Sequence, residues 1–481
     1  MALTPDVLAA TLELAESGRH NIDPTEVAVR PYPFPYVAAL AMNNDIDSTS
    51  RAAFEDWHDF VSGTGPTPYG DGLGLEVGDS FWVWCGTNGK TLSMHRQYPD
   101  EHPRVDSPDL NRIVELGRAG WLDTLHSFGN WRQDHKTVRH DLGHRDDARY
   151  ALDRLDSLGV KPRLYVNHSG SPSNVGGPWG HYQKADEPGH AMYCLDLLKA
   201  FGIRFFWTDA CMDMEKFGNE LDFGTQAELR AAFADYDFSA WLRRRDRAGI
   251  VIPINMPPNE NEQRNLLIGI FNRTFFPVRA ADGTTILVFK RHRGADQPTA
   301  TTFPYQVTSE NLDALEALGG AVIVYQHFGV FSGRGRPRER SLRRNTSPPV
   351  LDEHAVACWQ DIAARVHAGR LFVATTARLL HYLWLRKGLK LTVEKTRERW
   401  HVRLLGVSCP AAGWRALSSI DFNGLSFVIP AIAPEVTVTA HGSAAPLELR
   451  RAPDPGHPDC HALYRPWTGL EWPRQSAAAI N

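Results

Sequence analysis

Short apolar runs alternate with polar loops and helical segments along most of the chain. The helical stretch Asp146–Leu158 is followed by Gly159, and His190–Phe201 is followed by Gly202, as is common at helix ends. Strands that alternate with helices indicate βα units around a parallel sheet. The candidate strands are Tyr36–Met42, Ser80–Cys85, Trp121–Leu125, Arg163–Asn167, Arg204–Thr208, Ile250–Ile254, Thr285–Phe289 and Ala321–Gln326.

The pattern changes near Leu389, where alternating apolar and polar positions replace the helical spacing. The segments LKLTVEK, WHVRLLGV, LSFVIP and EVTVTA read as strands, and Asn423-Gly424 reads as a turn. We therefore expect an α/β protein in which residues 1–387 form a distorted (β/α) barrel with an N-terminal helix. Residues 388–481 would form a small β-sandwich-like domain, which either supports the barrel or binds sugar.

Composition and charge narrow the classes of partner. The 481 residues have a net charge of −4, which provides no global field for nucleic acid or an anionic membrane. No run of 18 apolar residues occurs, the first residues read as an amphipathic helix, and the six cysteines lack CxxC spacing. We expect a cytoplasmic protein that binds neither nucleic acid nor membrane; the oligomeric state stays open. The Arg-rich stretch 334–344 is either a solvated loop or a pocket for an anionic substrate.

Polar and ionisable residues come directly after several of the apolar runs. In a barrel of parallel strands, the carboxyl ends of the strands meet at one face and form the site. Each residue taken alone also has a structural interpretation; Asp47, for example, precedes Ser48-Thr49 and would suit a helix cap. Five runs end in such residues, namely Asp45 with Asp47, His126, Asn167 with His168, Asp209, and His327.

These motifs resemble those of the NodB-type polysaccharide deacetylases. The likeness spans roughly residues 34–330 and consists of Asp-x-Asp after the first strand, His-Ser after a later strand and a histidine after the last one. It implies that Asp45 is the general base, that Asp47 and His126 bind a divalent metal such as zinc, and that His327 is the general acid. The segment Phe206–Asp209 would line the pocket and orient the catalytic groups, which makes Asp209 a catalytic candidate.

The sequence departs from the family at the second metal-binding histidine. Asn130 stands four residues after His126, where the family has that histidine. An amide oxygen is a poorer zinc ligand than imidazole, so the metal is bound through Asn130, through a substitute such as His168, or not at all. A literal His-x3-His occurs at His140 and His144 but does not follow an apolar run, and the family's Arg-x-Pro-x-Gly motif is not visible.

The function we expect is metal-dependent deacetylation of an N-acetylated sugar or polysaccharide. A glycoside hydrolase on the same barrel is the alternative, with Asp45 or Asp47 opposite Asp209 or Asp213. A non-catalytic carbohydrate-binding protein is the third hypothesis. The candidate contacts to a carbohydrate substrate are Asn167, His168, Trp179, Trp207 and Tyr325.

Overall fold

The computed structural model describes most of the chain outside several segments. The described residues are 26–47, 49–86, 91–131, 144–168, 171–176, 184–208, 274–292, 298–331, 343–344, 348–409, 413–443 and 445–473. The predicted N-terminal helix and the predicted strand Ile250–Ile254 lie outside them.

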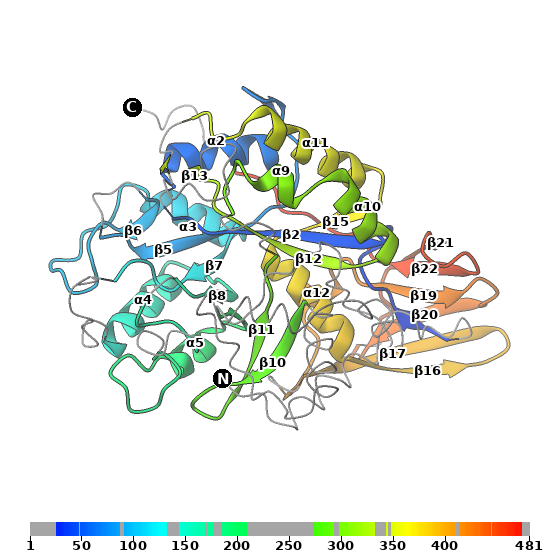
Figure 1. The fold of residues 1–481 in the computed structure, drawn as a ribbon. Coiled ribbons are helices and arrows are strands. Elements are labelled where there is room, and N and C mark those ends of the chain that lie inside the picture. Colours follow the sequence, from blue (N-terminus) through cyan, green and yellow to red (C-terminus); the bar gives the residue numbers. More distant parts are fainter. Residues whose placement is uncertain are drawn as a thin grey trace, which may run out of the picture.

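A strongly curled, mostly parallel sheet forms the centre of the molecule (Figure 1). Across the sheet the strands are β10 (Phe275–Arg279), β11 (Thr285–Phe289), β9 (Phe205–Trp207), β8 (Leu164–Val166), β7 (Leu122–His126), β5 (Asp79–Trp84), β2 (Ala38–Asn44) and β12 (Ala321–Gln326). Only the β10–β11 pair of this path is antiparallel. β6 (Ser93–His95) adds to β5, and β15 (Leu371–Val373) adds to β2.

The curl brings the chain just beyond β11 next to β12, at the other side of the sheet. His292, just beyond β11, forms an isolated parallel bridge with Val324 of β12, with hydrogen bonds of 2.6 and 2.9 Å. The described strands thus form a curled half-barrel, and this bridge links the chain just beyond β11 to β12. The predicted α/β alternation is confirmed for the described strands, and the predicted closure into a distorted barrel stays a prediction.

Strand β2 lies between two hydrophobic cores. Its residues Ala39 and Ala41 belong to the larger core, and Leu40 and Met42 belong to the smaller one. Successive side chains of a strand point to opposite faces, so a strand buried on both faces must be apolar at every position. This explains the unbroken run that marked the strand in the sequence.

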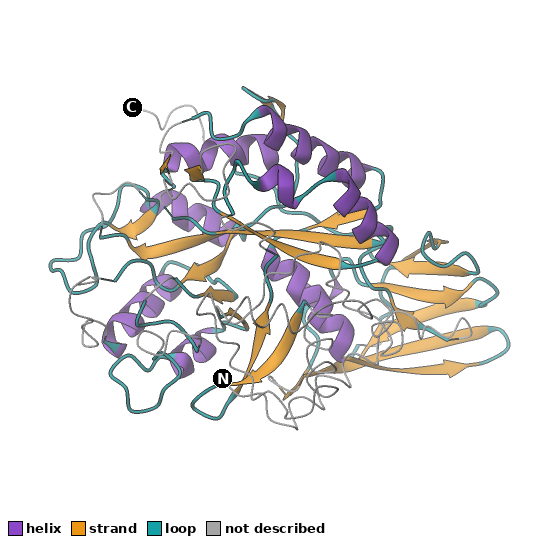
Figure 2. Ribbon diagram, viewed as in Figure 1, coloured by secondary structure: helices purple, strands orange, loops and turns teal. Residues whose placement is uncertain are grey.

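Helices cover the outside of the sheet, and Figure 2 shows one group of them lying along β2 and β12. Their bounds are α2 (Arg51–Val61), α3 (Leu110–Ala119), α4 (Arg145–Ser157), α5 (Leu195–Phe201), α9 (Phe303–Gln306), α10 (Ser309–Leu318), α11 (Glu353–His367) and α12 (Thr376–Gly388). Helix α5 begins five residues later than the predicted start at His190. None of the described helices is long and apolar enough to cross a membrane.

Two sheets follow α12. The first contains β16 (Leu389–Lys395), β17 (Arg399–Cys409), β18 (Gly413–Arg415) and β20 (Glu435–Ala440). The second contains β1 (Ala28–Val29), β19 (Ser426–Pro430), β22 (Cys460–Tyr464) and β21 (Arg450–Pro453). The predicted boundary at 387/388 falls where α12 passes into β16, but the second sheet also takes in β1 from the start of the described chain. The division into two domains stays a prediction.

Short elements complete the structure. They are the hairpin β3 (Pro66–Thr67) with β4 (Gly70–Asp71), the pair β13 (Val330–Phe331) with β14 (Arg343–Arg344), and a 3₁₀ turn at Ser419–Phe422.

Candidate active site

Ionisable side chains converge where β2, β7, β8 and β12 end. Asp45 and Asp47 follow β2, His126 ends β7, His168 follows β8 by two residues, and His327 follows β12. We call these five residues the carboxylate–histidine cluster. The parallel strands place their carboxyl ends at the same edge of the sheet, which is why residues 282 positions apart in the chain, Asp45 and His327, come within 3.9 Å.

Asp45 is buried and has a different neighbour on each carboxylate oxygen. Arg291 donates a hydrogen bond of 2.7 Å to Oδ1, while His126 and His327 place their Nε2 atoms 3.7 and 3.9 Å from Oδ2. Burial by itself raises the pKa of Asp45, but Arg291 and the two histidines outweigh it and leave the pKa below its usual value. Asp45 is therefore ionised at neutral pH, with one oxygen fixed by Arg291.

Asp47 is partly exposed and contacts two histidines. His168 Nε2 lies 3.0 Å from Oδ1, and His327 Nε2 lies 3.4 Å from Oδ2. Burial raises the pKa of Asp47, yet the histidine contacts prevail and hold the pKa well below its usual range. In the other direction, burial lowers the pKa of His168, but its attraction to Asp47 is stronger and the net pKa is raised. The two residues thus form an ion pair.

His126 differs from His168 in its charge. Burial lowers the pKa of His126 to about 4, against the opposing pull of Asp45 and Asp47, so the ring is neutral at pH 7. Its Nδ1 atom is buried and has no hydrogen-bond partner among the described residues. Trp82 packs against both rings, and its ring centre lies 6.1 Å from that of His126 and 5.1 Å from that of His168. A neutral imidazole is the form that ligates a metal.

Arg291 is the site residue that the sequence analysis missed. Its guanidinium lies 3.6 Å from the ring centre of Trp207 and 3.7 Å from that of Tyr325, and it also donates to Asn43 at 2.9 Å. The signal was present in the sequence, since Lys290-Arg291-His292 directly follows the apolar run of β11.

A divalent cation fits part of the cluster. One ligand atom each from Asp45, Asp47 and His327 lie within 4.8 Å of one another. Carboxylate oxygens with imidazole nitrogen are donors that zinc and similar divalent metals accept in proteins. These three residues are the ones placed to hold the ion. Next to them, the buried Nδ1 atom of His126 has no hydrogen-bond partner among the described residues.

The turn after β7 does not bring Asn130 beside His126, where the resemblance would place a second metal ligand. Ser127, Phe128 and Gly129 have φ values of 50°, 62° and 109°, all in the left-handed region, so no right-handed turn returns Asn130 to the face of His126. Instead the Asn130 side-chain nitrogen donates to the carbonyl oxygen of Cys85 at 2.8 Å. This contact holds the turn against β5 and gives no support to Asn130 as a metal ligand.

Three predicted substrate contacts have other roles in the structure. The Asn167 side chain donates to the carbonyls of Val175 and Gly176 and accepts from the Val175 amide, so it fixes the loop that follows β8. Trp207 and Tyr325 each use one ring face to stack on the guanidinium of Arg291. Their predicted role as platforms for a sugar ring is restricted to the other face.

Some predicted residues lie outside the described part of the chain, namely Asp209, Asp213, Trp179 and His140. His144, the second member of the literal His-x3-His pair, precedes α4 as its N-cap residue.

The fold and site define an α/β half-barrel with a carboxylate–histidine cluster at its strand ends. No family model matches the chain, and no curated protein matches it either. Among solved structures, an endo-beta1,6-glucanase is similar with 10% sequence identity, covering 91% of this chain and 93% of its own, at a TM-score of 0.30. A TM-score this low assigns neither a fold nor an activity.

Proposed function

We propose that this protein is a metal-dependent hydrolase that removes acetyl groups from an N-acetylated sugar or polysaccharide. The observation behind the proposal is the spacing of Asp45, Asp47 and His327, whose ligand atoms lie within 4.8 Å of one another. The choice of an amide in a carbohydrate rests on the resemblance of the strand-end motifs to the NodB-type deacetylases. A divalent cation held in this cluster would supply Lewis-acid polarisation of the amide carbonyl.

Asp45 is suited to accept a proton from the attacking water. Arg291 fixes Oδ1 at 2.7 Å and leaves Oδ2 facing the histidines, so a single oxygen is available for the transfer. Because the neighbouring positive charges keep Asp45 ionised, it is in the form that a general base needs at neutral pH. We assign this role to Asp45 Oδ2. One oxygen cannot bind the ion and accept the proton at once, so this assignment leaves the ion to Asp47 and its neighbouring histidines.

His327 has two alternative roles that experiment can distinguish. Its Nε2 atom is 3.4 Å from Asp47, which suits a second ligand to the same ion, and the motif resemblance makes it the acid that protonates the leaving amine. Its Nδ1 atom lies 3.0 Å from the carbonyl oxygen of Pro298, which fixes the ring orientation in either case. His327→Gln would lower metal content in the first case; in the second it would leave metal bound and slow turnover.

The experiment that tests the function is a metal analysis combined with an acetate-release assay. Wild type is expected to hold about one divalent ion per chain and to release acetate from N-acetylglucosamine oligomers, and exhaustive chelation should abolish release. Asp47→Ala should lose both properties, because it removes the carboxylate that contacts His168 and His327. Asp196→Ala, which removes an exposed partner of Arg145, is the matched control and should keep both.

Other outcomes would reject the proposal in different ways. Cleavage of glycosidic bonds that survives chelation would favour the glycoside hydrolase. Sugar binding without any turnover, in a protein free of metal, would favour the carbohydrate-binding protein.

A further inference from the structure

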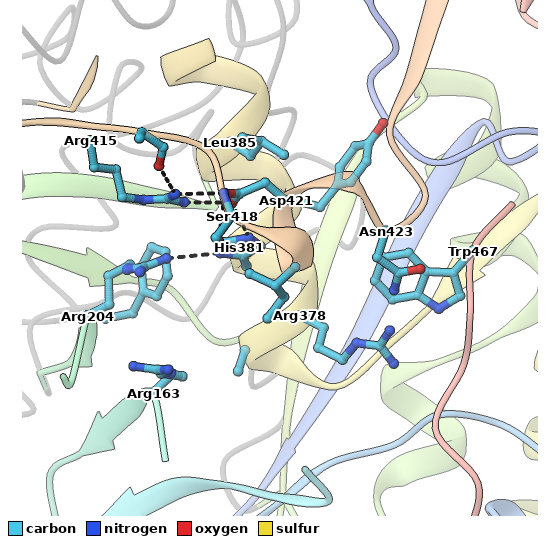
Figure 3. A pocket seen from close by; sticks show the side chains of 15 residues that line it. Arg163, Arg204, Arg378, His381, Leu385, Arg415, Ser418, Asp421, Asn423 and Trp467 are labelled. Atoms are coloured by element: carbon cyan, nitrogen blue, oxygen red, sulfur yellow. Dashed lines mark hydrogen bonds and ion pairs between the residues drawn. The ribbon is translucent and has the colours of Figure 1, made fainter. Parts of the chain in front are cut away.

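A cavity of about 330 Å³ lies at the opposite end of the strands from the candidate active site. Arg163 and Arg204 line it from the residues just before β8 and β9, whereas the carboxylate–histidine cluster lies beyond the strands' other ends. Five residues separate Arg163 from His168, about 16 Å of extended chain. The opposite wall comes from α12 and from the 3₁₀ turn after β18, so the cavity lies between the half-barrel and the C-terminal sheets (Figure 3).

The residues that line this cavity carry more positive than negative charge. Figure 3 shows Arg163, Arg204 and Arg415 along one side of it. Asp421 is the single carboxylate among the described lining residues, and Arg415 already binds both of its oxygens, at 2.6 and 2.7 Å. Arg378, a fourth lining arginine, pairs with Glu76 outside the cavity lining. Three guanidinium groups against one carboxylate leave two positive charges in excess.

His381 is neutral and does not change the excess of two positive charges. Arg204 donates to His381 Nδ1 at 2.9 Å, so that nitrogen carries a lone pair and the ring proton is on Nε2, 3.0 Å from Asp421 Oδ1. Burial lowers the pKa of His381, which keeps the ring neutral at pH 7. Arg204, which is half-buried, thus has a neutral acceptor where a desolvated guanidinium usually has a carboxylate.

The arginines are close enough to repel one another. The guanidinium groups of Arg204 and Arg415 lie 4.6 and 4.8 Å from the ring of the same residue, Trp384. Burial first, and then the charges of Arg415 and Arg163, lower the pKa of Arg204 to about 10. A bound anion would relieve this repulsion at the place where it is strongest.

Much of the remaining lining of the cavity is apolar or aromatic. Phe205, Tyr382, Leu385, Ile420 and Trp467 line it beside the polar Ser418 and Asn423, and Ile420 is 58% exposed although it is a large hydrophobic residue. Such a lining suits a ligand with an apolar or ring-shaped body next to its charged group.

We propose that this cavity binds a small organic phosphate, with the phosphate group on Arg163, Arg204 and Arg415 and the apolar body against Leu385, Ile420 and Trp467. A phosphate monoester has a charge of about −2 near neutral pH, which matches the excess of two positive charges. Guanidinium groups bind phosphate oxygens through paired, charge-assisted hydrogen bonds. The site is independent of the proposed hydrolase reaction, because it uses none of the residues of the carboxylate–histidine cluster.

Calorimetric titration with phenyl phosphate, inorganic phosphate and benzoate at constant ionic strength tests the proposal. Phenyl phosphate should bind saturably, more tightly than inorganic phosphate, which lacks the apolar body, and more tightly than benzoate, which has a single charge. Arg204→Gln and Arg163→Gln should each weaken phenyl phosphate about tenfold or more, the effect of losing one hydrogen bond to a charged group. Arg163 is exposed, so its variant is expected to fold even if Arg204→Gln does not.

Two control variants make the result specific. Arg399→Gln removes an exposed arginine that pairs with Glu435 on the C-terminal sheet, and its affinity for phenyl phosphate should equal that of wild type. Asp47→Ala should also bind normally. The proposal is overturned if no saturable binding occurs, if Arg163→Gln binds as wild type does, or if Asp47→Ala abolishes binding while the arginine variants retain it.

Discussion

Arg291 illustrates how one buried charge organises the candidate active site. Its side chain is fully buried, stacked between Trp207 and Tyr325, and bonded to Asn43 and Asp45. A buried guanidinium of this kind requires its carboxylate, and the carboxylate equally requires the guanidinium. The position of Asp45 Oδ2, which the proposed reaction uses, therefore depends on a residue from another strand.

Arg291→Gln should lower the free energy of unfolding at pH 7 by about 3–5 kcal/mol, because it leaves the buried charge of Asp45 without a partner. Urea unfolding provides the measurement. Arg399→Gln removes an exposed ion pair and should cost less than about 1 kcal/mol.

The double variant Asp45→Asn/Arg291→Gln provides the internal check. It should recover part of the loss, since neither charge then remains buried alone. If the two single losses simply add, the pair is not coupled and this account of the site is wrong.

At the scale of elements, the turn between β7 and the following segment fixes His126. Gly129 has a φ of +109°, and a Cβ atom at this position would lie 2.1 Å from the backbone oxygen of Trp84. The turn can therefore pass close to β5 only with glycine at this position. Asn130 then reaches Cys85, and His126 stays at the strand end.

Gly129→Ala should destabilise the protein by more than about 3 kcal/mol, since backbone strain and a backbone clash add. Gly442→Ala is the matched control, because Gly442 has a φ of +80° with no atom within 4 Å of the added Cβ. It should cost only about 1 kcal/mol, the strain of the left-handed conformation. Equal losses in thermal or urea unfolding would show that the close approach to Trp84 does not matter.

A carboxylate from β7 accepts a hydrogen bond from the first turn of helix α12. Asp123 accepts a 2.7 Å hydrogen bond from the Ala377 amide in the first turn of α12. Burial raises the pKa of Asp123 to about 6, although this bond and the one from Thr124 act in the opposite direction. Because its pKa is higher in the folded state, Asp123 contributes to stability fully below about pH 3.8. This contribution is lost as the pH rises through about 6.

Asp123→Asn should therefore become more stable relative to wild type as the pH rises, by about 2–3 kcal/mol between pH 4 and pH 8. Asparagine keeps an acceptor oxygen for the Ala377 amide but does not ionise. The difference in unfolding free energy between the two proteins, followed across this pH range, is the measurement. A difference that stays constant with pH would contradict the assignment.

At the scale of the whole molecule, the described chain returns to the half-barrel after the C-terminal sheets. Trp472 stacks on His58 at 4.7 Å, meets Trp121 edge-on at 5.1 Å and donates to Asp59 at 2.8 Å. Nearby, Arg112 donates to the carbonyl of Pro473. This segment joins the last residues described to α2 and α3, so the two parts of the molecule stabilise each other.

Trp472→Ala should cost about 3–5 kcal/mol and lower the melting temperature, because it opens a cavity among buried aromatic rings. Trp414→Ala, at a position that is 58% exposed, should change stability by less than about 1 kcal/mol. Similar melting temperatures for the two variants would mean that the C-terminal return adds little to stability.

The apolar runs in the sequence predict the strands that are buried on both faces and the residues that follow them. Apolar runs identify β2, β7, β8, β9, β11 and β12 because each position of such a strand is shielded from water. The same runs predict which polar side chains emerge at the carboxyl edge, and Asp45, Asp47, His126, His168 and His327 do lie together there.

Which of these groups touch one another depends on how the whole sheet folds. The partner of Asp45 is Arg291, 246 residues away, and the left-handed turn at Ser127–Gly129 directs Asn130 away from His126. Likewise, the arginines of the cavity between the half-barrel and the C-terminal sheets come from four separate segments. Hydrophobic periodicity reports local burial, whereas pairwise electrostatic contacts depend on the curl and register of the whole sheet, which no local pattern encodes.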